Sequence, residues 1–196
     1  MTKKGGQGDD ASKRAASLGH ELRQGIIQAT IWGPVSATEI AEKVGLPADK
    51  VRYQLRQLAE VGIVDVVERK ARRGVVEHFY LVNDSRTVLE DEDLGDLPAG
   101  VRDRFYTQIF KLVVGAASRS FRAGVLGRRE ESFVLNVPLR LDAEGWTELG
   151  PIFRKTLSDV ERVKAKSEAR LETSGEEPIL ATAALFLFEL PPDEEA

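Results

Sequence analysis

The spacing of apolar residues changes along the chain, and this spacing predicts helices first and strands afterwards. Residues 12–31 and 36–62 carry apolar side chains three or four positions apart, which is typical of amphipathic helices. Residues 63–69 and 75–82 (IVDVVER and VVEHFYLV) are rich in β-branched and aromatic side chains, as strands are. The sequence therefore predicts a helical region that ends in a β-hairpin.

Residues 36–62 (SATEIAEKVGLPADKVRYQLRQLAEVG) predict two short helices joined by a tight turn. Ser36 and Glu39 have the spacing of a capping box, in which each side chain pairs with a backbone N–H of the other. Gly45 is placed to end the first helix, and Pro47 to begin the second. The apolar stripe of the second helix consists of Val51, Leu55 and Leu58. Two short helices of this kind, the second polar and basic outside its stripe, predict a helix-turn-helix.

The segment between the two predicted strands is basic. It carries Arg69, Lys70, Arg72 and Arg73 and ends at Gly74. In isolation such a segment could be only a solvated turn. Directly after a helix-turn-helix it predicts a wing, a hairpin that lies along the DNA backbone or the minor groove.

The rest of the chain predicts helices and strands in alternation. Asp142 is placed to cap the second of these helices. The predicted elements are a helix over 98–123, a strand over 131–141, a helix over 143–172 and a buried strand over 178–190. We expect an α+β, mainly helical fold with four regions. These are a disordered leader (1–11), a winged helix-turn-helix (12–82), an acidic linker (83–97) and a helix–strand–helix–strand dimerisation region (98–196).

Residues 17–82 resemble the winged-helix domain of ArsR-type bacterial transcriptional regulators. The matching pieces come in the family's order: an S-x-x-E-I-A helix, a G-L turn, a recognition helix, a G-I-V strand start and a basic wing before HFYLV. The resemblance implies a homodimer that binds an inverted-repeat operator in double-stranded DNA and, by default, represses transcription. Relatives often have V-S-x-H-L in the recognition helix where this chain has VRYQL, so analogy does not predict the operator.

The side chains of the predicted interface suit contacts to base edges and contacts to phosphates. Arginine pairs in bidentate fashion with guanine, and glutamine with adenine. We therefore expect base contacts from Arg52, Arg56, Gln54 and Gln57. We expect phosphate contacts from Lys50, Ser36 and Thr38 and from the wing residues Arg69, Lys70, Arg72 and Arg73. Tyr53 either packs under the helix or touches the sugar-phosphate, and Asp49, which would repel phosphate, caps the helix instead.

Composition and charge narrow the possible functions. The chain has no cysteine and two histidines, His20 and His78, so we expect neither thiolate chemistry nor a metal site, and no cofactor. No apolar run is long enough to cross a membrane, and the first residues lack the apolar segment of a secretory signal, so we expect a cytoplasmic protein. Residues 1–82 carry a net charge of +3 and residues 83–196 of −7, which favours the first part as the polyanion-binding one.

Two questions stay open at this stage. The apolar residues of the C-terminal region form either a core or dimer interface, or an effector pocket with Arg119 or Arg122 as an anion partner. These residues are Phe105, Ile109, Leu112, Trp146, Leu149 and Phe153. The winged helix could also be a protein–protein module without specific DNA binding. An enzyme is not expected, because no catalytic constellation or glycine-rich phosphate loop is present in the sequence.

Overall fold

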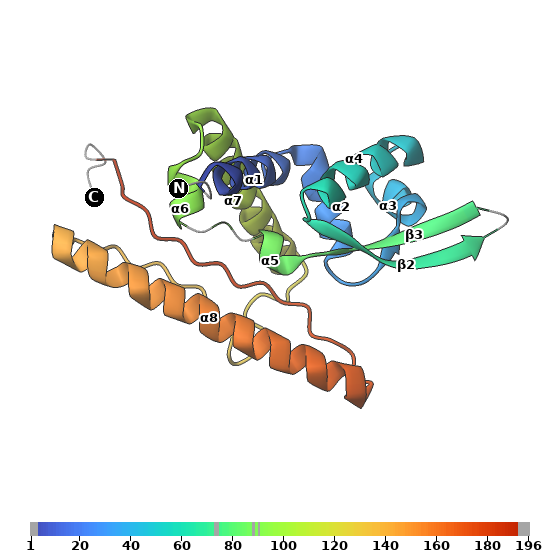
Figure 1. Cartoon of the computed structure of the whole chain (residues 1–196). Helices are drawn as coiled ribbons and strands as arrows, with labels where there is room; N and C mark the ends of the chain where they lie inside the picture. The colour runs from blue at the N-terminus through green and yellow to red at the C-terminus, as the bar shows by residue number, and fades with distance from the viewer. Residues whose placement is uncertain (1–3, 73–74, 88, 90, 192–196) are drawn as a thin grey trace. The chain divides into compact units, whose positions relative to one another are not determined.

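The computed structural model describes residues 4–72, 75–87, 89 and 91–191. Figure 1 shows the chain from its N-terminal helix to its C-terminal extended segment. The chain divides into two compact units, Met1–Gly115 and Ala116–Ala196, and the division falls inside a continuous helix. This differs from the predicted domain boundary in residues 83–97. Each unit is described by itself.

The first unit begins with two helices where the sequence predicts one. Helix α1 spans Lys4–Leu18 and α2 spans Glu21–Thr30. Residues 1–11 are expected as a disordered leader, whereas α1 already begins at Lys4 and Ala11 is buried. The chain breaks at Gly19, where another helix passes so close that only a glycine fits. A Cβ atom there would lie 3.0 Å from the backbone nitrogen of Phe105.

The helix-turn-helix forms as predicted. Helix α3 spans Ala37–Val44 and α4 spans Ala48–Glu60. Both hydrogen bonds of the capping box are present: Ser36 N donates to Glu39 Oε2 at 2.8 Å, and Glu39 N donates to Ser36 Oγ at 3.3 Å. Gly45 ends α3 in the left-handed conformation, with φ of 67°. Short-range sequence signals therefore fix both the start and the end of α3.

A three-stranded antiparallel sheet follows the helix-turn-helix, in the order β1-β3-β2. Strand β1 (Val35–Ser36) pairs at Val35 with Tyr80, β2 spans Val64–Arg72 and β3 spans Val75–Val82. The predicted hairpin is confirmed, but β2 continues to Arg72. The basic residues of the wing that the structure describes therefore lie in a strand rather than in a loop.

The predicted acidic linker contains two short helices, α5 (Asp84–Thr87) and α6 (Asp91–Gly95). Leu97 is buried, and Leu89 and Leu94 pack against the core. The described residues of this segment are therefore not a loose connection. Two arginines hold this segment in place.

Arg14 of α1 and Arg86 of α5 form a network of ion pairs. Arg14 Nη2 lies 3.1 Å from Asp93 Oδ2, and its side chain is almost completely buried. Arg86 Nη2 lies 2.7 Å from Asp10 Oδ1 and also donates to the carbonyl of Val61 at 3.1 Å. Val61 is the C-cap of α4, where a cation is favourable because unpaired carbonyls gather at a helix end. The network ties α1 to the segment that ends the helix-turn-helix.

Helix α7 spans Ala99–Arg122, close to the predicted range. Phe105 is buried, and Ile109 packs against the core. The main core of the first unit includes side chains of α2, α3, α4, the sheet and α7. Its fully buried large members are Leu18, Ile26, Ile40, Val51, Leu55, Leu58, Ile63 and Val64.

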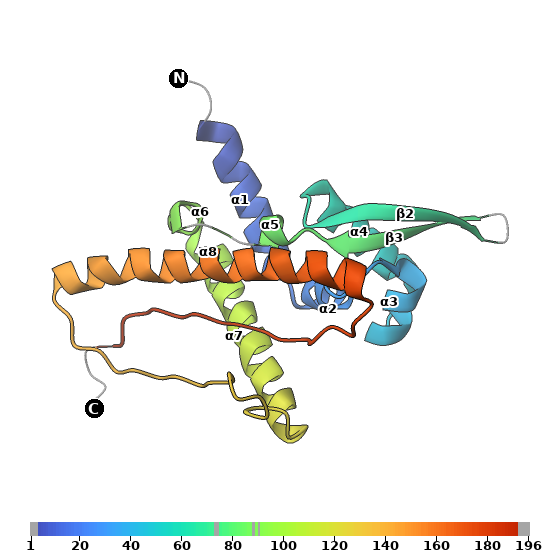
Figure 2. The same cartoon turned by 90° about the horizontal axis from the view of Figure 1, so that it is seen from below.

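The second unit contains α8, which spans Ala143–Ser174. The Asp142 side chain caps it by accepting from Gly145 N at 2.8 Å, as predicted. The two predicted strands, 131–141 and 178–190, are not strands in the structure, although both segments are extended (Figure 2). None of the residues described in 116–191 is buried. Among the described helices of the whole chain, none combines the length and the apolarity required to cross a membrane.

Candidate nucleic-acid interface

The inner face of α4 anchors this helix in the core. Val51, Leu55 and Leu58 are completely buried, as the spacing predicts. Burying an aliphatic side chain of this size contributes roughly 1.5–3 kcal/mol. Three such anchors hold the helix firmly, so its opposite face has a fixed orientation.

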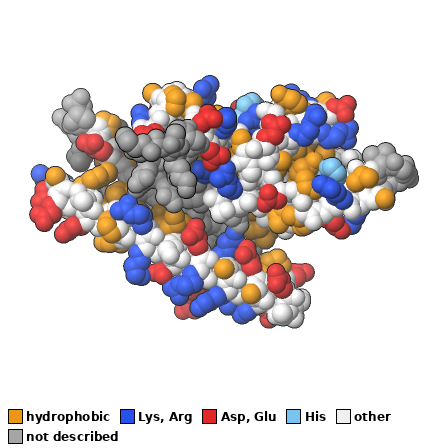
Figure 3. Space-filling view, viewed as in Figure 1, with side chains coloured by type: hydrophobic (Ala, Val, Ile, Leu, Met, Phe, Trp, Pro, Cys, Tyr) orange, Lys and Arg blue, Asp and Glu red, His pale blue; other side chains and the backbone are white. Residues whose placement is uncertain are grey.

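The outer face of α4 is basic and exposed. Lys50, Arg52, Tyr53 and Arg56 are all exposed, and Tyr53 is 52% accessible. Figure 3 shows Lys and Arg side chains on the part of the surface formed by the helix-turn-helix and the hairpin. Lys50, Arg52, Tyr53 and Arg56 lie on the N-terminal and middle turns of the helix, where a recognition helix contacts base edges.

Asp49 does not cap α4, because the N-cap is Pro47. The carboxylate of Asp49 instead forms an ion pair with the guanidinium of Arg52, one turn further along the helix. Both side chains are exposed. Asp49 therefore orients the side chain of Arg52 on the surface of α4.

Two predicted contact residues are buried. Gln54 is 9% accessible, and its Oε1 accepts a hydrogen bond from Arg23 Nε at 2.9 Å. Ser36 is 1% accessible, and its side chain is used in the capping box. The structure corrects the prediction for both residues, and neither belongs to the proposed contact set. Position 54 falls three residues after Val51 and one before Leu55, so helical spacing alone places it on the inner face.

The remaining predicted contacts of the helix-turn-helix are accessible. Thr38 is exposed at the start of α3, and Gln57 is half-buried on α4. Gln57 Nε2 donates to Glu60 Oε2 at 3.0 Å, one turn along the helix. Its amide is therefore engaged at the surface, where a base edge could replace the carboxylate.

Arg23 is a residue that the sequence analysis did not select. It lies on α2 and donates both to Gln54 on α4 and, at 2.8 Å, to Ser17 Oγ on α1. One side chain thus connects three helices behind the outer face of α4. The unusual position of a glutamine within the apolar stripe of α4 is the signal that points to such a partner.

The wing presents its cations on opposite faces. A β-bulge in β2 shifts the pairing register by one residue, so that Val66 pairs with Tyr80 but Glu68 pairs with Phe79. Beyond the bulge, Arg69 pairs with His78, which shares a face with Tyr80 because side chains alternate along a strand. Lys70 lies on the other face, 2.9 Å from Glu68 Oε2 and 4.6 Å from the ring centroid of Phe79.

The other two basic residues of the wing are described less fully. Only the backbone of Arg72 is described, as the last residue of β2. Arg73 lies outside the described residues. Their predicted phosphate contacts stay predictions.

Tyr80 connects the wing electrostatically to α4. Its side chain is almost completely buried, and this burial raises the pKa of Tyr80 above its usual value. The charges of Arg56 and Arg52 act in the opposite direction and lower the same pKa. Both arginines are therefore close enough to Tyr80 to affect its ionisation. Arg69 belongs to the Tyr80 face of the hairpin, so it lies on the side of the sheet nearer to the α4 arginines.

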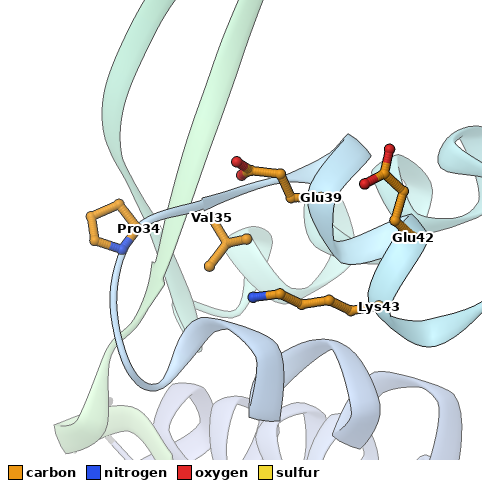
Figure 4. Close-up of a pocket in the computed structure, with 5 residues that line it drawn as sticks. All are labelled: Pro34, Val35, Glu39, Glu42 and Lys43. Atoms are coloured by element: carbon orange, nitrogen blue, oxygen red, sulfur yellow. The ribbon is translucent and has the colours of Figure 1, made fainter.

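A shallow hollow of about 460 Å³ lies beside the start of α3 (Figure 4). It is lined by Pro34, Val35, Glu39, Glu42 and Lys43. Glu39 is already used in the capping box, and the two carboxylates make the hollow a poor match for phosphate. We assign it no part in the interface.

The apolar residues that could line an effector pocket lie in different surroundings. Phe105 and Ile109 pack in the core of the first unit, and Leu112 is half-buried. Trp146 is exposed, whereas Leu149 and Phe153 are half-buried, all three on α8 of the second unit. The core position of Phe105 removes it from the pocket prediction. Among the described residues, no group of three His, Cys, Asp or Glu side chains has the arrangement of a metal site.

Comparison with known families agrees with this geometry. Residues 18–67 match a family described as a helix-turn-helix domain, which includes ArsR-type regulators. Residues 18–67 form a helix-turn-helix domain. Such a domain indicates a DNA-binding regulator. The match covers α2, the complete helix-turn-helix and the first part of the wing. No curated protein matches the chain.

Proposed function

We propose that this protein is a homodimeric, sequence-specific transcriptional regulator of the ArsR type that binds an inverted repeat in double-stranded DNA. The observation that carries the proposal is the outer face of α4. Arg52 and Arg56 are exposed on a helix whose opposite face is fixed by three fully buried side chains. A rigid helix with two outward arginines has the geometry for reading guanine in the major groove.

Within this proposal the contact residues divide into two groups. Arg52, Arg56 and Gln57 read base edges, each good bidentate pair contributing roughly 1–3 kcal/mol of discrimination. The others contact the backbone and give affinity without sequence preference. These are Lys50, Tyr53, Thr38, Arg69, Lys70, Arg72 and Arg73. The protein acts in the cytoplasm, as a repressor, and has no catalytic activity.

The test begins with selection of bound duplexes from a random DNA library by the full chain. We expect an inverted repeat whose half-site centres lie about 10 base pairs apart or at a multiple of that distance. The selected duplex is then titrated with the double variant Arg52→Ala/Arg56→Ala. We expect the specific affinity to fall to the level of a scrambled duplex while the circular dichroism spectrum stays unchanged.

A charge-matched control separates base reading from general electrostatics. Arg128 and Arg129 are both exposed and lie outside the helix-turn-helix and the wing, so Arg128→Ala/Arg129→Ala removes the same charge elsewhere. This control should retain specific binding. Equal losses in the two double variants would reject α4 as the reading element, and no enriched sequence at all would reject specific DNA binding by the free protein.

The wing is tested by the salt dependence of binding. The charge of Arg69 should act mainly on phosphate, so Arg69→Gln should weaken binding to specific and scrambled duplexes alike. The slope of log affinity against log salt concentration should become shallower by about two, because each copy in the dimer loses one phosphate contact. Arg128→Gln is the matched control and should leave the slope unchanged. A loss confined to the specific duplex would assign Arg69 to base reading instead.

A further inference from the structure

Two extended segments of the second unit lack the hydrogen bonds that their sequences favour. Among the described residues, no backbone–backbone hydrogen bond is made by residues 133–141 or 178–185. Both are apolar and exposed: Phe133 is 84% accessible, Leu135 75% and Ile179 62%. Exposed apolar chain with unpaired backbone groups readily pairs with another strand. These segments are the largest unexplained feature of the described structure.

The first segment has the properties of an edge strand. From Phe133 to Leu141 every second residue is a large apolar one, so a strand here would have one apolar face. Pro138 falls between these positions and lacks an N–H group. Since backbone groups of successive residues point to opposite edges, Pro138 blocks one edge of the strand and leaves the other able to pair.

The second segment has the properties of a central strand. Residues 178–190 (PILATAALFLFEL) are apolar at nearly every position, which is typical of a strand covered on both faces. After its first residue the segment has no proline, so both of its edges are able to pair. A central strand needs two neighbours, and the chain supplies only the edge strand 131–141 within this unit.

The connection between the segments suits parallel pairing. Helix α8 lies between them in the sequence, and parallel strands require a crossover of this kind. Figures 1 and 2 show residues 175–191 running back along α8 in the opposite direction. The lengths also agree, since the 32 residues of α8 span about 48 Å and a 13-residue strand about 43 Å.

We propose that residues 131–141, α8 and residues 178–190 form a β–α–β unit that becomes ordered in the dimer. Residues 178–190 of two copies pair antiparallel across the two-fold axis, and residues 131–141 pair at each outer edge. The result is a four-stranded sheet whose central strands come from different copies. The proposal rests on the homodimer of the proposed function and specifies which surface forms it.

A second copy fits this surface better than any folding within one chain. Two strands alone are marginally stable in water, whereas three or more strands with an apolar face are stable. A symmetric antiparallel pair also gives residues 178–190 their second neighbour from the same segment of the other copy, as a two-fold axis requires.

The absence of cysteine from the sequence allows a direct test. A single cysteine is placed at each of residues 181–185 in turn, and disulfide-linked dimer is measured after mild oxidation of the full chain. A two-fold axis normal to the sheet passes through one pair of equivalent residues. At neighbouring positions the two equivalent residues are about 7 Å apart along the strands, too far for a disulfide. We expect one strong maximum with weak cross-linking on either side.

Ala59→Cys is the matched control. Ala59 is exposed on α4, outside both segments, and should give only the background that random collision produces. Cross-linking at the control as strong as at residues 181–185 would overturn the proposal. A uniform yield across residues 181–185 would do the same, since it indicates a flexible contact without register.

The outcomes separate this proposal from the proposed function. A dimer by analytical ultracentrifugation without cross-linking at residues 181–185 would reject the strand pairing and leave the DNA-binding dimer in place. A strong maximum in a protein that selects no DNA sequence would support the interface and reject the function. A monomer at micromolar concentration would reject both the dimer and this interface.

Hydrogen exchange on the unmodified protein is independent of any variant. We expect the amides of residues 179–190 to exchange slowly in the dimer and to become fast on dilution below its dissociation constant. Fast exchange at all concentrations would overturn the proposal, because a paired strand protects its amides.

Discussion

Arg23 on α2 donates a hydrogen bond to Gln54 on α4, with 2.9 Å between Arg23 Nε and Gln54 Oε1. The bond lies behind the face of α4 that we propose for base reading. It also explains why a glutamine occupies the inner stripe of that helix. Arg23 is therefore a residue that positions α4 without reaching its outer face.

Replacement of Arg23 should destabilise the fold more than replacement of an outer arginine. Arg23→Ala leaves the buried amide of Gln54 and the hydroxyl of Ser17 without this donor, which costs about 1–3 kcal/mol. Urea denaturation followed by circular dichroism measures the change. Arg56→Ala, on the exposed face of the same helix, should change the unfolding free energy by less than about 0.5 kcal/mol. Equal changes in the two variants would contradict a structural role for Arg23.

Two glycines should respond in opposite directions to replacement by alanine. A Cβ at Gly19 would lie 3.0 Å from the backbone nitrogen of Phe105, so α7 must shift, at a cost of about 1–3 kcal/mol. A Cβ at Gly25 would lie 3.8 Å from a methyl group of Val44, which is an ordinary contact. Gly25 is inside α2, so Gly25→Ala should stabilise the fold by about 0.5–1 kcal/mol. Thermal unfolding of both variants gives the comparison, and a stabilising Gly19→Ala would show that α7 is not packed on this corner.

Neighbouring cations of α1 should differ in their effect on stability. Arg14 is almost completely buried and is paired with Asp93 and Asp10. Its loss leaves Asp93 without this partner, while Asp10 keeps its ion pair with Arg86, and we expect a cost of about 1.5–3 kcal/mol. Lys13 is exposed and pairs with Asp9 at the surface, so Lys13→Ala should have a much smaller effect on stability than Arg14→Ala. Denaturant midpoints of the two variants test this, and a mild Arg14→Ala would mean that α1 is held by its apolar contacts alone.

Tyr80 should make the fold sensitive to alkaline pH. Burial raises the pKa of Tyr80 above its ordinary value of 10.0. Below that value both the folded and the unfolded chain keep the proton, so the contribution of Tyr80 to stability is complete. As the pH rises above it, the unfolded chain ionises first and the unfolding free energy falls.

The variant Tyr80→Phe should remove the part of the fall in unfolding free energy at alkaline pH that comes from Tyr80. Unfolding free energies measured from pH 8 to pH 11 in the variant and in the unmodified protein give the difference. The control is Tyr53→Phe, at an exposed position on α4, which should leave the fall in unfolding free energy at alkaline pH unchanged. A curve for Tyr80→Phe that coincides with that of the unmodified protein would contradict the expected ionisation behaviour of Tyr80.

The elements predicted correctly are those that short-range signals define. The capping box at Ser36, the left-handed Gly45 and the cap at Asp142 each depend on residues within three or four positions of one another. The buried stripe of α4 depends on spacing within a single helix. Each of these signals lies within a few consecutive residues of the sequence. The helix-turn-helix and its boundaries could therefore be predicted without knowledge of distant contacts.

The elements predicted wrongly depend on distant contacts. The break between α1 and α2 falls at Gly19, which meets the backbone of Phe105, more than eighty residues later in the chain. Helices α5 and α6 are held partly by Arg14 and its ion pairs, which no local pattern reveals. Residues 131–141 and 178–190 have the composition of strands, but a strand needs a neighbour, and composition does not say from which chain the neighbour comes.

The bulge in β2 determines which of the wing's cations faces the α4 arginines. Val67 is the extra residue between the pairs Val66–Tyr80 and Glu68–Phe79. If Val67 instead took a place in an uninterrupted ladder, opposite Phe79, every side chain of β2 beyond that point would exchange faces. Lys70 would then occupy the side of Tyr80, and Arg69 the side of Phe79. The charge pattern that this hairpin offers therefore depends on the bulge, and losing the bulge would change the pattern without altering a single basic residue.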